Sequence, residues 1–258
     1  MWAVGSSGMQ PVSQAPRLSA SAREKLARCG AANISNSLLK RGFRNTFLSG
    51  LHPVSDGQPA LVGPAYTVRF IPAREDLDSM ALYQSEQSLH RRAIEECPPG
   101  AVLVMSTGGE TRVSCMGDMM ALRLRVRGVA GVVTDGGFRD SPGIRSTGLS
   151  CFQRETSGPA TPILLRPVEL NVPVGCAGVA VYPGDIVVGD AEGVVVIPAH
   201  LADEVADEAL DAVEYEAFVS AHLRLGRSLF GLFPATPDSR IEYERWVARG
   251  RPALERGQ

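Results

Sequence analysis

Residues 117–140 read GDMMALRLRVRGVAGVVTDGGFRD and carry the most informative spacing in the chain. Gly117-Asp118 begins a short helical segment, Val129 to Thr134 reads as an apolar strand, and two glycines then lead to Arg139-Asp140. The start of a helix and the end of a strand can direct backbone amides, a guanidinium and a carboxylate at one small anionic ligand. The spacing therefore suggests a metal site and chemistry on a keto acid.

The residues before this stretch alternate between helical and strand patterns. Ser19 to Lys40 is expected to be helical, with a capping box at Ser21 to Glu24 as its start. Ala60 to Ile71 alternates as a strand does, and Asp76 to Glu95 has helical periodicity. Ala101 to Ser106 is a compact apolar strand followed by a Gly-Gly turn, which brings the chain back toward the central stretch.

The residues after this stretch change character several times. From Gly143 to Pro167 they are rich in Ser, Thr, Gly and Pro, so we expect strands joined by exposed loops. Residues 172–197 are rich in valine and in tight-turn residues, which predicts hairpins. His200 to Leu225 combines an apolar stripe with many acidic residues, which predicts a surface or interface helix. The apolar residues of 226–258 indicate docking onto another subunit or back onto the core.

Length and composition favour one domain with a tail. The chain has 258 residues, of which 44% are hydrophobic, an ordinary fraction for a globular core. We expect a disordered leader over residues 1–16, the main domain over 17–220 and a helical tail over 221–258.

Charge and cysteine content argue against several classes of protein. Lysine and arginine total 26 against 28 acidic residues, and a net charge of -2 gives no drive toward nucleic acid or anionic lipid. The densest basic cluster, Arg123, Arg125 and Arg127, is interpreted as a solvated helix edge. The five cysteines lack a C-x-x-C pair and are interpreted as reduced, buried thiols. Without a secretory start or an apolar run of roughly 18 residues, a cytoplasmic protein with no membrane partner is expected.

Each half of the central motif also has a simpler interpretation. Asp118 could be an ordinary N-cap that satisfies the first amides of its helix. Alternatively, the first-turn amides of Met119 and Met120 stay free to hold a carboxylate. Arg139-Asp140 could likewise be a surface ion pair, although its position after a Gly-Gly strand end favours a functional role.

Two sequence features together resemble a known family. These are Asp118 followed after twenty residues by Arg139-Asp140, and the segment YPGDIVVGDAEGVVVIP at residues 182–198. The sequence resembles the family that contains the regulator of ribonuclease E activity A and the 4-hydroxy-4-methyl-2-oxoglutarate aldolases. The resemblance covers roughly residues 19–219 and is most specific over 100–198. It implies an α/β fold of the swivelling-domain type, a β/β/α sandwich flanked by N- and C-terminal helices, assembled as a homotrimer or homohexamer.

The resemblance also implies an activity, a cofactor and site residues. Gly117 to Met120 and Arg139 would bind a 2-keto acid, and Asp140 would ligate a divalent cation, Mg²⁺ or Mn²⁺. Arg139 would stabilise the enolate, and Asp118 would orient the metal-bound water that accepts the substrate proton. The expected reactions are aldol cleavage of 4-hydroxy-2-oxo acids to pyruvate and decarboxylation of oxaloacetate. A non-catalytic regulator of an RNA-processing enzyme and a lyase or hydratase for another keto acid remain alternatives.

The resemblance also draws attention to the two terminal helical regions. It places an acidic side chain from a neighbouring subunit's late helix at the site, and Glu214 or Glu216 could serve, although a solvated face is the simpler interpretation. Asn33-Ile-Ser-Asn36 stands where the family would have Thr and Asp.

Three further aspartates have structural interpretations. Asp185 and Asp190 are interpreted as caps of tight turns. Asp135 could be either a partner of Arg139 or a turn residue.

Overall fold

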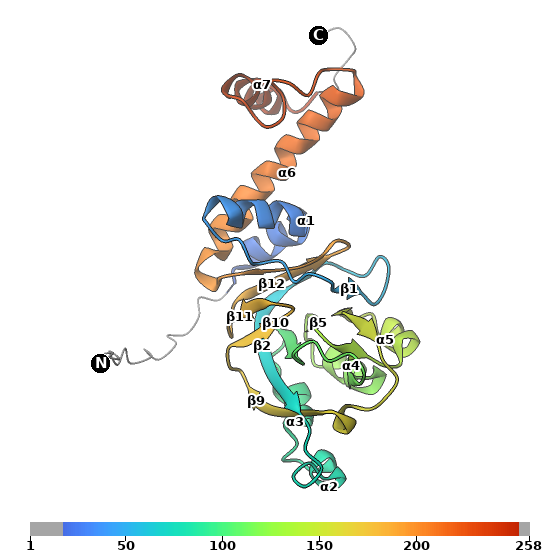
Figure 1. Ribbon diagram of the computed structural model, residues 1–258. Coiled ribbons are helices and arrows are strands. Elements are labelled where there is room, and N and C mark those ends of the chain that lie inside the picture. The colour runs from blue at the N-terminus through green and yellow to red at the C-terminus, as the bar shows by residue number, and fades with distance from the viewer. Residues whose placement is uncertain (1–17, 253–258) are drawn as a thin grey trace, which may run out of the picture.

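The computed structural model describes residues 18–252, so the leader expected over residues 1–16 lies outside the described part of the chain. A curved sheet forms the centre, with helices on both sides (Figure 1). No helix within residues 18–252 is both long and apolar enough to cross a bilayer. The expected α/β class with flanking helices is confirmed.

The main sheet has eight strands, seven of them in the order β1-β7-β5-β3-β2-β12-β13, with β9 also paired to β2. Strands β2, β3, β5 and β7 run parallel, whereas β1, β9, β12 and β13 each pair antiparallel with a neighbour. The bounds are β1 His52–Pro53, β2 Leu61–Pro72, β3 Val102–Ser106, β5 Gly131–Thr134, β7 Ser150–Gln153, β9 Leu165–Leu170, β12 Ile186–Asp190 and β13 Gly193–Ile197.

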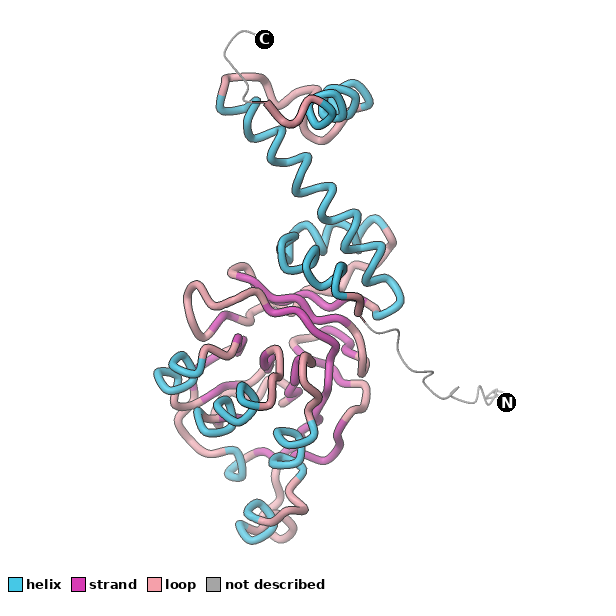
Figure 2. The backbone as a smooth tube through the Cα atoms, turned by 180° about the vertical axis from the view of Figure 1, so that it is seen from behind, coloured by secondary structure: helices cyan, strands magenta, loops and turns pink. Residues whose placement is uncertain are grey.

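The long strand β2 joins the two halves of this sheet. Its first residues pair with β12, its middle pairs with β3 and its end pairs with β9. Alternate side chains of β3 enter different cores: Leu103 lies on the side covered by α3, α4 and α5, and Val104 lies on the opposite side. The helices on the first side are α3 Leu89–Glu96, α4 Asp118–Val126 and α5 Ser141–Thr147. Figure 2 shows these helices from behind, beside the strands.

Two smaller sheets complete the architecture. Strands β4 Ser114–Met116, β6 Gly137–Phe138 and β8 Glu155–Thr156 form a parallel sheet of three. Strands β10 Val174–Cys176 and β11 Val179–Val181 form a hairpin. Hairpins were expected over residues 172–197, and this prediction is confirmed.

Helix α1, Ala20–Lys40, packs on β12 and β13 together with α6, Ala202–Arg224. It bends at Gly30, whose φ of 74° lies in the left-handed region that favours glycine. The bend exposes the amide of Ala31, which donates to Asp190 Oδ2 at 2.8 Å. Asp190 thus caps the second half of α1 as well as its own turn, where Oδ1 accepts from Glu192 N.

The last helices leave the body of the molecule. Helix α6 extends away from the sheet, and α7, Pro237–Ala248, folds back on its far end (Figure 1). This end has its own apolar cluster, built mainly from Tyr215, Phe218, Leu232 and Tyr243.

Three local predictions need correction. Helix α1 is capped by Ser19, whose hydroxyl accepts from Ala22 N at 3.0 Å, and not by Ser21. The helix predicted over Asp76 to Glu95 is interrupted, because α2 spans only Met80–Gln84 and the chain turns before α3 begins. The irregular stretch after Gly143 contains α5, which sequence periodicity did not indicate.

Candidate active site

The small sheet of β4, β6 and β8 brings the two halves of the central motif together. Strands β4 and β6 run parallel, and the amide of Arg139 donates to the carbonyl of Met116 at 3.0 Å. Gly117 follows β4 directly and Arg139 follows β6 directly, so both leave the same edge of this sheet. Helix α4 and strand β5 account for the residues between them.

The start of α4 offers unpaired backbone donors. Gly117 is the N-cap and provides no side-chain acceptor. Among residues 18–252, no acceptor bonds the amides of Met119 or Met120. Asp118 is the first helical residue and makes no capping hydrogen bond, so its interpretation as the N-cap is wrong. The amides can therefore receive an anion, as helix N-termini commonly do.

Gly117 leaves room for the two side chains of the motif. A Cβ atom at this position would lie 2.7 Å from Asp140 Oδ2 and 3.0 Å from Arg139 Nε. Its φ of −126° is ordinary extended backbone, so the requirement for glycine is space and not conformation. The absence of a side chain lets the carboxylate and the guanidinium lie against the start of α4.

Arg139 and Asp140 form an ion pair at the surface. Arg139 Nε lies 3.3 Å from Asp140 Oδ2, and each side chain is 46% exposed. Asp140 also has left-handed backbone angles, φ 57° and ψ 38°, at the start of α5. Such a conformation costs roughly 1–3 kcal/mol in a residue other than glycine, and it is found preferentially at functional sites. It turns the Asp140 side chain back toward Gly117.

Asp118 reaches the next helix. A Cβ atom on Gly143 would lie 2.6 Å from Asp118 Oδ2, so the absence of a side chain at Gly143 admits the carboxylate. Asp118 is half-buried between the start of α4 and the first turn of α5. All sequence-predicted site residues lie together at the starts of these two helices: Gly117, Asp118, Met119, Met120, Arg139 and Asp140.

The donor set suits a hard divalent cation that keeps much of its water. No group of three or more His, Cys, Asp or Glu side chains in residues 18–252 could hold a metal ion. A single half-exposed carboxylate, Asp140, fits Mg²⁺ or Mn²⁺, since these ions prefer oxygen ligands and complete their shells with water and substrate.

The two methionines border an open groove between α3 and α4. Met119 is 68% exposed, and Met120 is half-buried against the main core. The groove has a volume of about 590 Å³, and arginines 91, 92 and 123 also line it. The two methionines form an apolar edge of the groove, and its charged lining includes Glu86 and Glu95 as well as these arginines.

Two buried polar residues form hydrogen bonds with the backbone near the motif. Asp135 accepts hydrogen bonds from the amide and hydroxyl of Thr107, at 2.7 and 3.0 Å, and from the amide of Ala177 at 3.3 Å. It therefore joins loops and does not pair with Arg139. Gln153 Oε1 accepts from the amide of Phe138 at 2.7 Å, immediately before Arg139. Gln153 was not predicted from the sequence, although a glutamine at the end of an apolar strand was a usable signal.

The other candidates have structural partners. Asp185 accepts from the amides of Tyr182 and Ala199, so its role as a turn cap is confirmed, and burial raises its pKa. In the basic cluster, Arg123 pairs with Glu95 at 2.8 Å and Arg127 lies 3.6 Å from the same residue.

The late acidic residues also have partners within the described residues. Glu214 pairs with Arg251 at 2.9 Å, and Glu216 accepts from Asn33 Nδ2 at 3.1 Å. The acidic side of α6 therefore faces partners on α1 and beyond α7, and is not simply solvated.

Comparison with known proteins identifies the family. Residues 31–196 match the family described as RraA-like, Aldolase/RraA. A protein of Halalkalibacterium halodurans, provisionally named a 4-hydroxy-4-methyl-2-oxoglutarate aldolase, is 32% identical over 62% of this chain and 70% of its own length.

Two solved structures are similar over most of this chain. The structure of Streptomyces coelicolor RraAS2, titled an unusual member of the RNase ES inhibitor RraA protein family, is 34% identical. Its TM-score is 0.68, with 79% of this chain and 98% of that chain covered. An uncharacterized protein of Pseudomonas syringae pv. tomato is 25% identical with a TM-score of 0.71, covering 83% and 96% of the two chains. With its family match, its relatives and its fold in agreement, the chain belongs to the RraA-like family.

Proposed function

We propose that this protein is a divalent-metal-dependent carbon–carbon lyase that cleaves 4-hydroxy-2-oxo acids such as 4-hydroxy-4-methyl-2-oxoglutarate to pyruvate. Oxaloacetate decarboxylation is proposed as a second reaction, because both reactions leave a pyruvate enolate. One observation supports this proposal most strongly: Arg139 and Asp140 lie against Gly117 at the start of α4, where no side chain caps the first amides. The name of the relative from Halalkalibacterium halodurans supports the same class of reaction.

The residues of the chain would bind and polarise the substrate. The amides of Met119 and Met120 would donate to the carboxylate of the keto acid, helped by the positive end of the helix dipole. The guanidinium of Arg139 would donate to the 2-oxo oxygen, where negative charge develops as the carbon–carbon bond breaks. Asp118 would orient the water that takes the proton from the substrate hydroxyl. The contact of Arg139 strengthens as charge appears on the 2-oxo oxygen, and such a differential interaction accelerates the reaction, whereas the amide contacts to the carboxylate position the substrate.

Asp140 would hold the cation through its half-exposed carboxylate. A bound Mg²⁺ or Mn²⁺ supplies Lewis-acid polarisation of the 2-oxo group and of the substrate carboxylate. Asp140 would thereby also fix the position of Arg139, whose Nε lies 3.3 Å from its Oδ2.

We further propose that the active assembly is a homotrimer or a homohexamer with sites near subunit boundaries. The half-exposed Arg139 and Asp140 of one chain are consistent with a site that a neighbouring copy completes.

Pyruvate release is the direct test. Purified protein is assayed with 4-hydroxy-4-methyl-2-oxoglutarate and with oxaloacetate, in Mg²⁺ and in EDTA, for the wild type and for Asp140→Ala. We expect release in Mg²⁺, loss in EDTA, and activity of Asp140→Ala at the EDTA level. Arg139→Ala should lower kcat by about 100- to 1,000-fold, as removal of one donor to a developing oxyanion does.

An exposed aspartate away from the site provides the control. Asp56→Ala, which carries the same change of charge, should keep wild-type activity. Turnover that survives EDTA, or an active Asp140→Ala protein, would contradict the metal-dependent mechanism.

The similarity to Streptomyces coelicolor RraAS2 favours a second candidate, a non-catalytic regulator of an RNA-processing enzyme. If no keto acid is cleaved, inhibition of a purified RNase E-type nuclease by the full chain decides whether that function holds. A chain that neither cleaves keto acids nor inhibits the nuclease would exclude both.

A further inference from the structure

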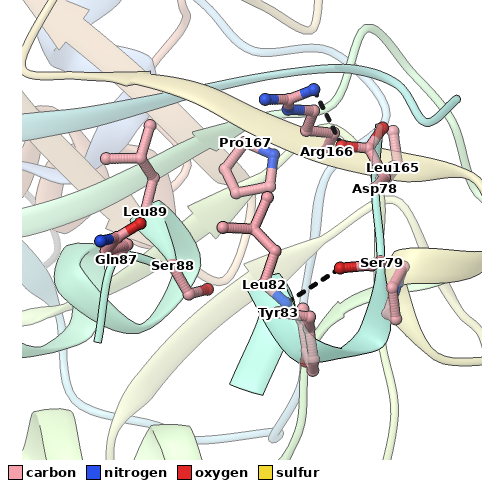
Figure 3. A pocket seen from close by; sticks show the side chains of 11 residues that line it. Asp78, Ser79, Leu82, Tyr83, Gln87, Ser88, Leu89, Leu165, Arg166 and Pro167 are labelled. Carbon is pink, nitrogen blue, oxygen red and sulfur yellow. Dashed lines mark hydrogen bonds and ion pairs between the residues drawn. The ribbon is translucent and has the colours of Figure 1, made fainter. Parts of the chain in front are cut away.

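A cavity separate from the candidate active site lies between α2, α3 and β9 (Figure 3). Its volume is about 210 Å³, and none of its lining residues belongs to the site described above. Drug-sized ligands fill pockets of roughly 300–1,000 Å³, so this cavity suits a smaller molecule.

The hydroxyl of Ser88 lines the cavity and is available for a hydrogen bond. Ser88 is only 6% exposed and occupies the N-cap of α3, yet it makes no capping hydrogen bond. No hydrogen bond to its hydroxyl is formed within residues 18–252, and Figure 3 shows it among the side chains that line the cavity. By contrast, Ser79 at the start of α2 caps its helix by accepting from Leu82 N. The Ser88 hydroxyl can therefore donate to or accept from a ligand in the cavity.

Asp78 provides a second open acceptor. Its side chain is 9% exposed, and Oδ2 accepts from the amide of Arg74 at 2.7 Å. Oδ1 is buried and lies 2.9 Å from Arg166 Nη1, but in a geometry that is not a hydrogen bond. The ion pair cancels the charge at this end of the cavity while leaving Oδ1 able to accept from a ligand.

The remaining wall is mostly apolar. Leu82 lies between Asp78 and Ser88, with Leu89 and Pro167 beside it (Figure 3). Leu165 forms the wall on the side of β9. The cavity therefore combines an apolar body with several hydrogen-bonding groups, among them Asp78 Oδ1 and Ser88 Oγ, and it has no net charge. A charged ligand would leave water without gaining an opposite charge, whereas an uncharged one would not.

We propose that this cavity is a binding site for a small uncharged amphiphile that carries a hydroxyl group. The hydroxyl donates to Asp78 Oδ1 or bonds Ser88 Oγ, and the apolar part packs on Leu82 and Leu89. The site is independent of the proposed lyase activity.

Three probes that share one apolar body test the proposal: benzyl alcohol, benzylammonium and benzoate. Each is titrated into the full-length protein, and the leucine methyl signals are followed by NMR. Benzyl alcohol should shift the methyl signals of Leu82, Leu89 and Leu165 along a saturable curve, with a Kd of about 1 mM. The two charged probes should bind at least about tenfold more weakly, because each would bring an unpaired charge into the cavity.

Variants of the protein test whether the probe binds in the cavity or at another surface. Ser88→Ala should weaken benzyl alcohol about fivefold, the effect of one neutral hydrogen bond. Leu82→Trp should fill the cavity and abolish binding, and α2 has no buried residue that this change would disturb. Met80→Trp, on the same helix but outside the cavity and 55% exposed, should bind as the wild type does.

Several results would overturn the proposal. They are a linear response to benzyl alcohol, equal or tighter binding of a charged probe, and unchanged binding by Leu82→Trp. The circular dichroism of each variant shows whether it is folded, and the comparison of probes on the wild type does not depend on any variant.

Discussion

At the scale of single residues, the candidate site depends on the missing side chain of Gly117. Gly117→Ala places a methyl group 2.7 Å from the present position of Asp140 Oδ2, so the carboxylate must move. We expect kcat/KM for pyruvate release to fall about 100-fold, as displacements of about 1 Å do. The extended backbone at Gly117 accepts alanine, so Tm should change little. Steady-state kinetics and thermal unfolding measure the two effects.

Gly158→Ala is the matched control, because no atom lies within 4 Å of the Cβ that it adds. It should retain wild-type kinetics. An active Gly117→Ala enzyme would mean that the positions of Arg139 and Asp140 do not matter for turnover.

The grouping of the candidate residues was predictable because each half of the motif is local, whereas their roles stay predictions. Gly117 to Met120 and Arg139-Asp140 each form one short segment, and a helix start or strand end is visible in sequence. The contact of Asp118 with Gly143 and the support from Gln153 were not predictable, because each joins segments that only the folded chain brings together.

At the scale of elements, His90 links α3 to the strand that precedes the site. Its Nε2 lies 2.6 Å from the carbonyl oxygen of Cys115 in β4, and its ring packs against Phe70 and Tyr83. Burial lowers the pKa of His90 to about 4; the hydrogen bond to Cys115 opposes the shift and the nearby charge of Arg91 adds to it. The folded state therefore holds a neutral imidazole that donates to β4.

This lowered pKa predicts a loss of stability in acid. The unfolded histidine takes up a proton below about pH 6.5, whereas the folded one resists protonation until about pH 4. Above about pH 6.5 the neutral state of His90 makes its full contribution to the free energy of unfolding. This contribution declines by about 3 kcal/mol as the pH falls to 4. Urea unfolding between pH 7 and 4 should show a decline in the free energy of unfolding that is about 3 kcal/mol larger for the wild type than for His90→Gln, which keeps the lowered pKa of His222. Parallel pH profiles for the two proteins would contradict the assignment.

Elements were predicted well where a compact and mostly apolar run was bounded by turn residues, as in β3 and β5. They were predicted poorly where tertiary contacts determine the local structure. The bend at Gly30 exists because Asp190, far along the chain, caps Ala31. Strands β4 and β6 are so short that only their pairing with each other defines them.

At the scale of the whole molecule, the end of α6 and α7 form a unit with its own core. The hydroxyl of Tyr215 donates to the carbonyl of Leu232 at 2.5 Å and lies 2.7 Å from Ser239 Oγ, and Phe218 packs on Tyr243 and Trp246. This cluster shares no buried residue with the three clusters around the main sheet. It also lies beyond residues 31–196, which match the family.

Separate cores predict separate unfolding. Phe218→Ala removes a fully buried ring, a change that costs about 3–5 kcal/mol, and the loss should fall on the unit that contains it. Hydrogen exchange read by mass spectrometry should show faster exchange in residues 215–248, with unchanged protection in β2, β3 and β5. Phe152→Ala, in the core beneath the main sheet, should instead weaken protection across those strands. If Phe218→Ala also accelerated exchange in the main sheet, the α6–α7 unit and the sheet would unfold together. Their stabilities would then be coupled through α6.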